Sequence, residues 1–503
     1  MKNWLKVSSA AVGIAMIAAP AFGHQPGHRR SPPAVHRAHP SASIATPASG
    51  ERRWLAGDHH IHSQFSADYT ENAADPAQPP TPVLGADGRY PIPTNAEMAK
   101  THGLAWMVST DHGGPNHSKI DHDLAYPELM RSRLLVPEVL QFYGMEFDTP
   151  AGDHSSLIVP NTRDEREALH GIEHGFSKRD TWPRDPSRDT EPRMIDALTH
   201  MKALKSPPIV IANHPSRSAT GVGAWGAYTP QEFRNWNDTA PNVAIGMEGA
   251  PGHQASALRA DGSSNRLGVR GGYGKSPTLG GFDQMTARLG GFWDAMLGEG
   301  RGWWITSTSD SHHNWRDGGD DFWPGEYSKT YVLATRDHAD ILEGLRGGRV
   351  FVTTGDLISE LDLTVRTIGG HEAMIGGEVR GKPGEAVEVK IRVRDPAGSN
   401  HAGRRPEVRR IDLIVGRVTG PAADRSADTN PTTRVEQRFT PETWVRDGEY
   451  IVVTHTLPRL DASLYLRVRG TSTDELEPVA DVAGEDPWAD LWFYSNPVFI
   501  NKL

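Results

Sequence analysis

The stretch "LAGDHHIHSQFSAD", Leu55–Asp68, gathers His60, His62 and Asp68 at the end of a short apolar run that predicts a buried strand. Two histidines on alternate strand positions are common on a solvated face, so the pair alone does not establish a metal site. What this stretch means for fold and function therefore depends on partners further along the chain.

Composition bounds the class of protein. A chain of 503 residues is too long for one ordinary core, so we expect two folded domains plus extensions. Hydrophobic residues make up 37%, charged residues 23%, and the net charge is -10, which is typical of a soluble globular protein and predicts no nucleic-acid partner. Cysteine is absent, so any bound metal must use His, Asp and Glu.

The first residues predict export. Lys2 and Lys6 precede an apolar run, Val7–Pro20, and small residues follow at the spacing of a cleavage site, so residues 1–23 are predicted to be a removable signal peptide. The run is shorter than a membrane-spanning helix requires. We expect a periplasmic or secreted protein with no membrane contact after signal removal. Residues 24–50, rich in Pro, Ser, Ala and His, predict a disordered linker.

Residues 51–357 alternate between two hydrophobic patterns. Short apolar runs such as "GLAWMVSTDH", "LQFYGMEF", "PPIVIANHP" and "GWWITSTSDSH" predict buried strands, whereas "TNAEMAKTH", "RMIDALTHMKALK", "FDQMTARLGGFWDAMLGEG" and "HADILEGLRGG" predict helices. This alternation indicates a parallel α/β domain with its site at the carboxyl ends of the strands. The Pro-rich insertion 69–93 is either a lid over that site or a surface loop.

Residues 358–503 follow a different pattern. Val387, Val389, Ile391 and Val393 alternate with charged residues, and "SLYLRVRG" repeats the same period of two. With turn residues between the runs, this pattern predicts an antiparallel β-sandwich domain. We see no catalytic constellation in it.

Metal-capable side chains recur at the predicted strand ends of the first domain. They are Asp58, His60, His62, Asp68, Asp111, His112, Glu146, His154, His214, Asp310 and His312. So many imidazoles and carboxylates at successive strand ends imply two or three divalent ions, and this donor set suits manganese, zinc or iron.

The order of these motifs resembles the polymerase and histidinol phosphatase (PHP) family. "DHHIHS", "STDHG", "GMEFDTPAGDH", "NHP" and "SDSH" occur in the order in which that family carries its motifs. Further segments, including "GMEGAPG", "YSKTYVLA" and "YSNPVFI", resemble the exported branch of the family that includes carbaryl hydrolase. The resemblance implies a distorted (β/α)7 barrel around a binuclear or trinuclear metal centre.

The resemblance also implies a ligand for each ion. His60, His62, Glu146 and Asp310 would hold the first ion; Glu146 would bridge to a second held by His154 and His214; Asp68, His112 and His312 would hold a third. Whether the third position is filled stays open. We expect Asp58 and Asp111 to accept the second ring N–H of a ligating histidine, His59 to be exposed, and Glu248 to lie outside the centre.

The function that this set favours is metal-dependent phosphoester hydrolysis, most of all of small organophosphate diesters, by a hydroxide that the ions activate. Glu146 would be essential, Arg217 and Lys329 would neutralise phosphate oxygens, and His313 is a candidate proton donor to the leaving group. A hydrolase of aryl carbamates or carboxylic esters is the alternative, with a pocket lined by Trp303, Trp304, Trp315 or Phe322. A non-catalytic metal-binding or adhesion protein is the third possibility.

Overall fold

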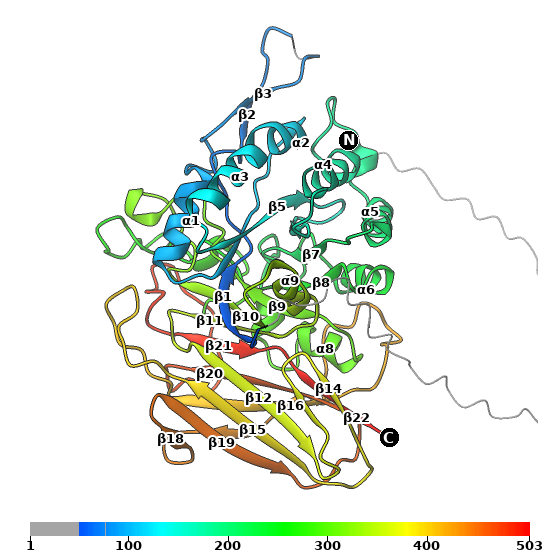
Figure 1. Cartoon of the computed structure of the whole chain (residues 1–503), viewed down its shortest axis with the longest axis vertical. Helices are drawn as coiled ribbons and strands as arrows, with labels where there is room; N and C mark the ends of the chain where they lie inside the picture. Colours follow the sequence, from blue (N-terminus) through cyan, green and yellow to red (C-terminus); the bar gives the residue numbers. More distant parts are fainter. Residues whose placement is uncertain (1–49, 76) are drawn as a thin grey trace, which may run out of the picture. The chain divides into compact units, whose positions relative to one another are not determined.

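The protein is known from a computed structural model that describes residues 50–75 and 77–503 (Figure 1). The predicted signal peptide and the predicted linker up to residue 49 lie outside these residues. None of the described helices is long and apolar enough to cross a bilayer.

Strands and helices alternate through the first part of the chain, as the sequence predicts. The strands are β1 (Arg53–Asp58), β2 (Asp68–Thr70), β3 (Thr81–Val83), β4 (Trp106–Ser109), β5 (Leu140–Asp148), β6 (His154–Ile158), β7 (Ile209–Ala212), β8 (Ala244–Ala250), β9 (Trp304–Ser307), β10 (Ser328–Ala334) and β11 (Val350–Thr354). The helices are α1 (Ile92–Thr101), α2 (His117–Ile120), α3 (Tyr126–Leu135), α4 (Glu165–Phe176), α5 (Glu191–Ala203), α6 (Pro230–Thr239), α7 (Gln284–Ala287), α8 (Phe292–Gly298) and α9 (His338–Arg346). Single turns of other helix types lie at η1 (Asp121–Ala125), η2 (Pro186–Arg188), η3 (Arg270–Gly272) and η4 (Trp315–Asp317).

Local sequence explains where several of these elements begin and end. All four residues of β7, "IVIA", are buried, as expected for a strand covered on both faces. Helix α6 begins at a capping box between Thr229 and Glu232, with Pro230 in its first turn. The single helix predicted near residues 282–300 is wrong. It is two short helices, because Gly290 has a φ of 71° and Gly291 is extended, which interrupts the helical backbone.

The main sheet is mixed rather than parallel. In the first part of the chain its hydrogen-bonded order is β11-β10-β1-β4-β5-β6-β7-β8-β9. The pairs β1/β4, β4/β5, β7/β8 and β8/β9 are parallel, whereas β6 is antiparallel to both of its neighbours. Only a short turn, residues 149–153, joins β5 to β6, and such a turn can make a hairpin but not a parallel crossover. The expectation of an α/β fold is confirmed, and that of an all-parallel sheet is wrong.

Described elements beyond residue 358 are strands. They are β12 (Glu360–Thr367), β13 (Glu372–Met374), β14 (Glu378–Gly381), β15 (Val387–Arg394), β16 (Arg410–Arg417), β17 (Arg434–Phe439), β18 (Val445–Asp447), β19 (Tyr450–Leu457), β20 (Leu464–Thr471), β21 (Trp492–Ser495) and β22 (Val498–Lys502). Five of them form a separate antiparallel sheet in the order β13-β12-β15-β19-β18. The order β14-β22-β20-β21 continues the main sheet from β11, with β16 and β17 attached beside β20. In β15 the predicted apolar positions are buried and alternate with more exposed ones.

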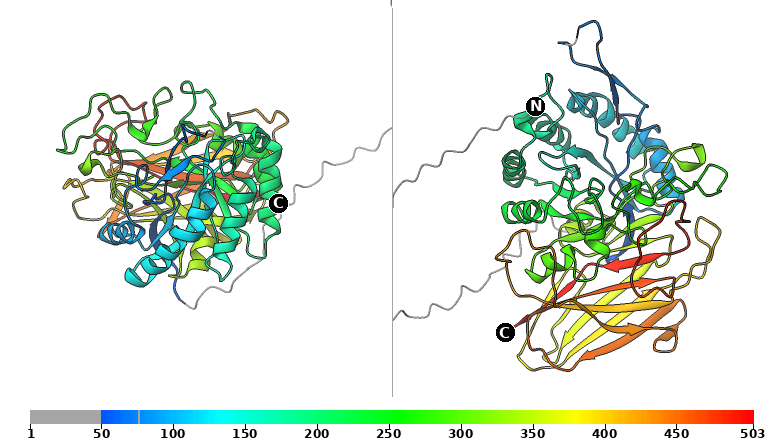
Figure 2. Two further views of the ribbon diagram at one scale, coloured as in Figure 1. Left: turned by 90° about the horizontal axis from the view of Figure 1, so that it is seen from above. Right: turned by 180° about the vertical axis from the view of Figure 1, so that it is seen from behind.

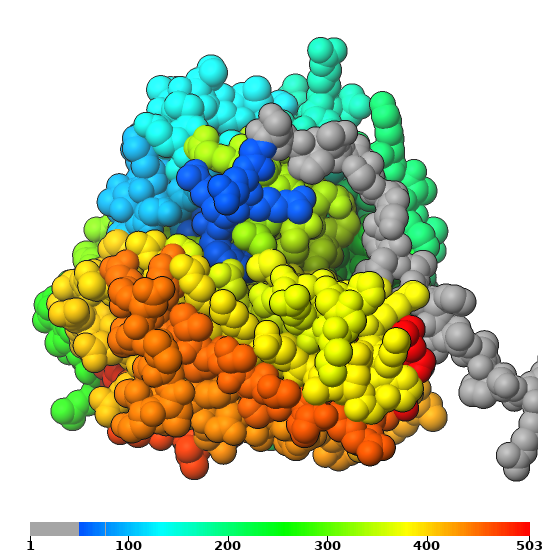
Figure 3. All heavy atoms as spheres, turned by 60° about the horizontal axis from the view of Figure 1, so that its bottom comes forward, coloured from blue at the N-terminus to red at the C-terminus, as the bar shows by residue number. Residues whose placement is uncertain are grey.

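The two halves of the chain share the main sheet. Strand β21 pairs antiparallel with β11, with Phe351 opposite Ser495, so the change of pattern after residue 357 is not a break in the sheet. From behind, the C-terminal strands lie together on one side and the helices of the first part on the other (Figure 2). When the bottom of the view in Figure 1 is turned forward, the yellow and orange atoms of the C-terminal strands form one continuous face (Figure 3).

A buried ion pair also joins the two halves. Arg467 of β20 donates to both carboxylate oxygens of Asp294 in α8, at 2.9 and 2.8 Å, and both side chains are 1% exposed. Neither charge can reach water, so each is stable only with its partner.

We predict that Asp294→Ala lowers the free energy of unfolding by about 3–5 kcal/mol, because it leaves the Arg467 guanidinium buried and unpaired. The control is Asp474→Ala, which breaks the exposed pair between Asp474 and Arg409 and should cost less than about 1 kcal/mol. Urea unfolding of the three proteins measures both effects. An equal decrease in the free energy of unfolding in the two variants would show that the Asp294–Arg467 pair does not stabilise the contact between α8 and β20.

Candidate metal centre

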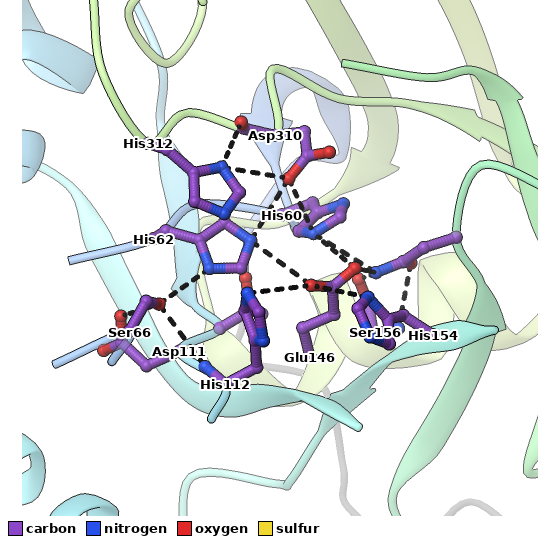
Figure 4. A network of polar contacts seen from close by, with 12 residues as sticks. His60, His62, Ser66, Asp111, His112, Glu146, His154, Ser156, Asp310 and His312 are labelled. Carbon is purple, nitrogen blue, oxygen red and sulfur yellow. Dashed lines mark hydrogen bonds and ion pairs between the residues drawn. The ribbon is translucent and has the colours of Figure 1, made fainter. Parts of the chain in front are cut away.

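The loops that follow the first and last predicted motifs lie side by side. Ile61 forms a parallel bridge with Ser311, and the backbone N–H of His62 donates to the Ser311 carbonyl at 3.0 Å. This brings the loop after β1 against the loop after β9. Together with the ends of β4, β5 and β7 and the start of β6, these loops place the predicted ligands other than Asp68 in one cluster, much of which Figure 4 shows.

Four of these residues form one group. Donor atoms of His60, His62, Glu146 and Asp310 all lie within 4.8 Å of one another, and all four residues are buried. His60 Nε2 is 3.0 Å from both Glu146 Oε1 and Asp310 Oδ1, and His62 Nε2 is 3.1 Å from Asp310 Oδ1. His62 Nε2 and Asp310 Oδ1 are buried without a hydrogen-bond partner. Buried imidazole nitrogens and carboxylate oxygens that face one another without a hydrogen bond are groups that a metal ion can bind, so these residues fit a metal ion.

The Glu146 carboxylate lies between this group and two further histidines. Its Oε1 is 3.0 Å from His214 Nε2, and its Oε2 is 3.1 Å from His154 Nδ1. Each carboxylate oxygen of Glu146 therefore lies next to an imidazole nitrogen, and the two nitrogens come from different histidines. The structure brings His154 and His214 to Glu146, as the sequence predicts for a bridging carboxylate.

A third group contains an unexpected carboxylate. His62, His112 and His312 lie close enough to share an ion, and Asp87 Oδ2 is 3.0 Å from His112 Nε2 and 3.7 Å from His312 Nε2. The prediction of Asp68 is corrected here. Asp68 is exposed on β2, where it pairs with Val83, because the chain leaves the centre through the β2/β3 hairpin and returns at Asp87. The insertion 69–93 thus brings a carboxylate to the centre.

His253 also lies in the centre, although the sequence did not predict it as a ligand. Its Nε2 is 3.1 Å from Asp310 Oδ2 and its Nδ1 is 2.5 Å from Asp321 Oδ1. Asp321 in turn accepts the backbone N–H groups of His312 and His313. The only sequence signal was the position of His253 directly after the segment "GMEGAPG", in the loop that follows β8.

Polar contacts behind the ligands fix which ring nitrogen faces the centre. His60 Nδ1 donates to Glu248 Oε1 at 2.7 Å, and His62 Nδ1 donates to Ser66 Oγ at 2.8 Å, while Ser66 donates to Asp111. Each contact leaves Nε2 free to bind a cation. The expectation that Glu248 lies outside the centre is therefore wrong, and Asp111 orients His62 through a serine rather than directly.

Two other predictions about neighbouring residues are wrong. Asp58 accepts the backbone N–H groups of His60 and Ser309, at 3.0 Å each, so it orders the two ligand loops and not an imidazole ring. His59 is fully buried and bridges Ser156 and Thr306.

Backbone strain marks two of the ligands. His214 has a φ of 29° and Asp310 a φ of 48°. This left-handed backbone conformation is rare for residues other than glycine. Such strain persists where the surroundings hold it, and it is concentrated at functional sites.

The three predicted auxiliary residues have different positions. Arg217 and His313 line a cavity of about 450 Å³ above the centre, and Arg217 Nη1 is 3.8 Å from Asp310 Oδ2. Lys329 does not line it: its ammonium group pairs with Asp356 Oδ1 at 2.5 Å. The prediction that Lys329 neutralises phosphate is corrected accordingly.

The charges of the centre keep its carboxylates ionised. Burial by itself raises the pKa of a carboxyl group, but the surrounding histidines outweigh it and hold the pKa values of Glu146 and Asp310 well below their ordinary range. Burial lowers the pKa of His154, but Glu146 and Asp148 outweigh it and raise the pKa to about 10. Protonation of His154 therefore offsets part of the negative charge of these carboxylates.

Comparison with known proteins adds no assignment. No family model matches the chain, and no curated protein matches it.

We predict that metal binding releases at least one proton at pH 7, because His154, with a pKa of about 10, must lose its proton to become a ligand. The apparent metal affinity should accordingly rise with pH over the neutral range. Calorimetric titration with zinc or manganese in two buffers of different ionisation enthalpy counts the protons. A binding heat that is the same in both buffers would contradict this charge balance.

Proposed function

We propose that the protein is an exported metal-dependent phosphoesterase that acts on small organophosphate diesters. One observation carries the proposal: the carboxylate of Glu146 has nitrogens of His60, His154 and His214 within 3.1 Å. Glu146 belongs to two of the clusters of side chains that could each hold an ion. Shared ligands favour two or more neighbouring ions, the arrangement that phosphatases and nucleases use. The order of the motifs supports membership of the PHP family, with a β/α barrel and a C-terminal β-sandwich.

Residues of this chain would bind the ions and position the substrate. His60, His62, Glu146, His154, His214 and Asp310 would hold two ions, and His112, His312 and Asp87 a third, as manganese, zinc or iron. Bound ions would supply Lewis acidity toward a phosphoryl oxygen and lower the pKa of a water. Arg217 at the cavity wall would pair with a second phosphate oxygen. His313, also on the wall, would be placed to protonate the leaving alcohol.

The charges around the cavity favour a diester over a monoester. Among the described residues that line it, Arg217 is the only arginine or lysine, whereas Asp87, Asp320 and Asp321 are acidic. A monoester carries up to two negative charges near pH 7 and would be repelled more strongly than a singly charged diester.

The aromatic pocket expected for an aryl carbamate or ester hydrolase is not formed by the residues predicted to line it. Trp303, Trp304, Trp315 and Phe322 are all buried, between 0% and 9% exposed, and none of them lines the cavity. The described residues that line the cavity therefore offer no aromatic wall to a neutral carbamate, whereas Arg217 on its wall can pair with the negative charge of a phosphodiester. A non-catalytic role is disfavoured because the donor atoms open onto a cavity large enough for a small substrate.

The proposal is tested with metal-loaded protein and three substrates: a bis-aryl phosphate, an aryl monophosphate and an aryl carbamate. We predict turnover of the diester that exceeds that of the other two. We also predict that Glu146→Gln lowers the diester rate by a factor on the order of a thousand or more, since the amide keeps the shape but not the charge that holds two ions together.

The matched control is Glu165→Gln, which removes another buried carboxylate that pairs with Arg133 on α3. It should leave the rate within about threefold of the wild type, provided that the protein is folded. Preferred hydrolysis of the carbamate, or full activity of Glu146→Gln with the diester, would refute the proposed function.

A further inference from the structure

A second group of metal-capable side chains is buried outside the centre. His117, the first residue of α2, lies near Asp121 at the start of the π-helical turn η1 and near Glu173 on α4. Each of the three side chains is 2% exposed or less. None of them was among the predicted ligands, and none lines the cavity above the centre.

The geometry of the three residues suits a shared cation. His117 Nδ1 is 2.9 Å from Glu173 Oε1 and 3.8 Å from Asp121 Oδ2, and the donor atoms all lie within 4.8 Å of one another. Donors that each bind zinc at about 2.0–2.2 Å lie roughly 3–4 Å apart. The π-helical turn is also notable, because such turns occur frequently at functional sites.

Two carboxylate oxygens in this group lack partners. Asp121 Oδ2 and Glu173 Oε2 are buried without a hydrogen-bond partner, as is the hydroxyl of the nearby Tyr143. In the described part of the chain, neither carboxylate has an arginine or lysine within ion-pair distance. With both carboxylates ionised, one imidazolium balances only one of the two negative charges, so the buried group then needs either a further cation or a proton shared between the carboxylates.

The other nitrogen of His117 fixes the state of the ring. Its Nε2 donates to the Phe65 carbonyl at 3.0 Å, and a carbonyl can only accept. In a neutral ring the proton therefore stays on Nε2, and Nδ1 presents a lone pair to the two carboxylates. A backbone carbonyl behind the ring is the usual support of a metal-bound histidine.

We propose that His117 Nδ1, Asp121 and Glu173 bind one divalent transition-metal ion, with zinc favoured by the mixed nitrogen and oxygen donors. A neutral His117 and two ionised carboxylates then balance the ion's two positive charges. Through His117 the ion ties α2 and α4 to Phe65, which lies in the loop between His62 and Ser66. Its role is structural: it holds the loop that orients His62.

The direct test is an anomalous difference map from crystals of the full protein grown with zinc, measured on both sides of the zinc absorption edge. We expect a peak among His117, Asp121 and Glu173, separate from the peaks at the centre. Peaks at the centre alone would overturn the proposal and would mean that the two carboxylates share a proton instead.

Metal analysis after gel filtration tests the same site in solution. Glu173→Gln should carry one equivalent less than the wild type. Asp180→Asn is the matched control and should lose none, because Asp180 is equally buried and close by, but its oxygens are taken up by Ser118. Glu146→Gln should lose metal from the centre and keep the anomalous peak at His117. If Glu173→Gln folds and keeps the full metal content, the assignment is wrong; if it does not fold, the anomalous map decides.

Discussion

Burial of the Glu146 carboxylate is the constraint on which the centre depends. At 2% exposure this charge has almost no contact with water, so positive charge must gather around it, either as protonated imidazoles or as metal ions. Residues from the ends of β1, β4, β5, β6, β7 and β9 supply that surrounding shell. The sheet order explains why they can: with β8 between β7 and β9, these strands follow one another along one hydrogen-bonded path, and a loop contact joins the ends of β1 and β9.

The supporting contacts make the arrangement specific. Glu248 holds His60 through its ring nitrogen and His214 through its backbone N–H, so a single buried carboxylate positions two ligands. The unusual backbone conformations of His214 and Asp310 belong to the same arrangement. The C-terminal strands contribute indirectly, since β21 pairs with β11 and Arg467 pairs with Asp294, and both contacts brace the sheet that carries the ligands.

The sequence predicted much of this and missed the rest for identifiable reasons. Short motifs directly after apolar runs located His60, His62, His112, Glu146, His154, His214, Asp310 and His312, because a strand end fixes where such residues point. Asp87 and His253 escaped because they lie in long irregular segments, whose path back to the centre has no periodic signal. Glu248 was misjudged since its partner, His60, is far away in the chain and close only in the folded sheet. Antiparallel β6 was missed because a buried strand has the same pattern in either direction.

Electron paramagnetic resonance of the manganese-loaded protein tests most directly whether Glu146 joins two ions. Two Mn²⁺ ions that share a carboxylate and lie about 3.5–4 Å apart are magnetically coupled. The account predicts a coupled spectrum in the wild type that Glu146→Gln converts to that of isolated ions. A wild-type spectrum of isolated Mn²⁺ ions alone, at full metal loading, would contradict it.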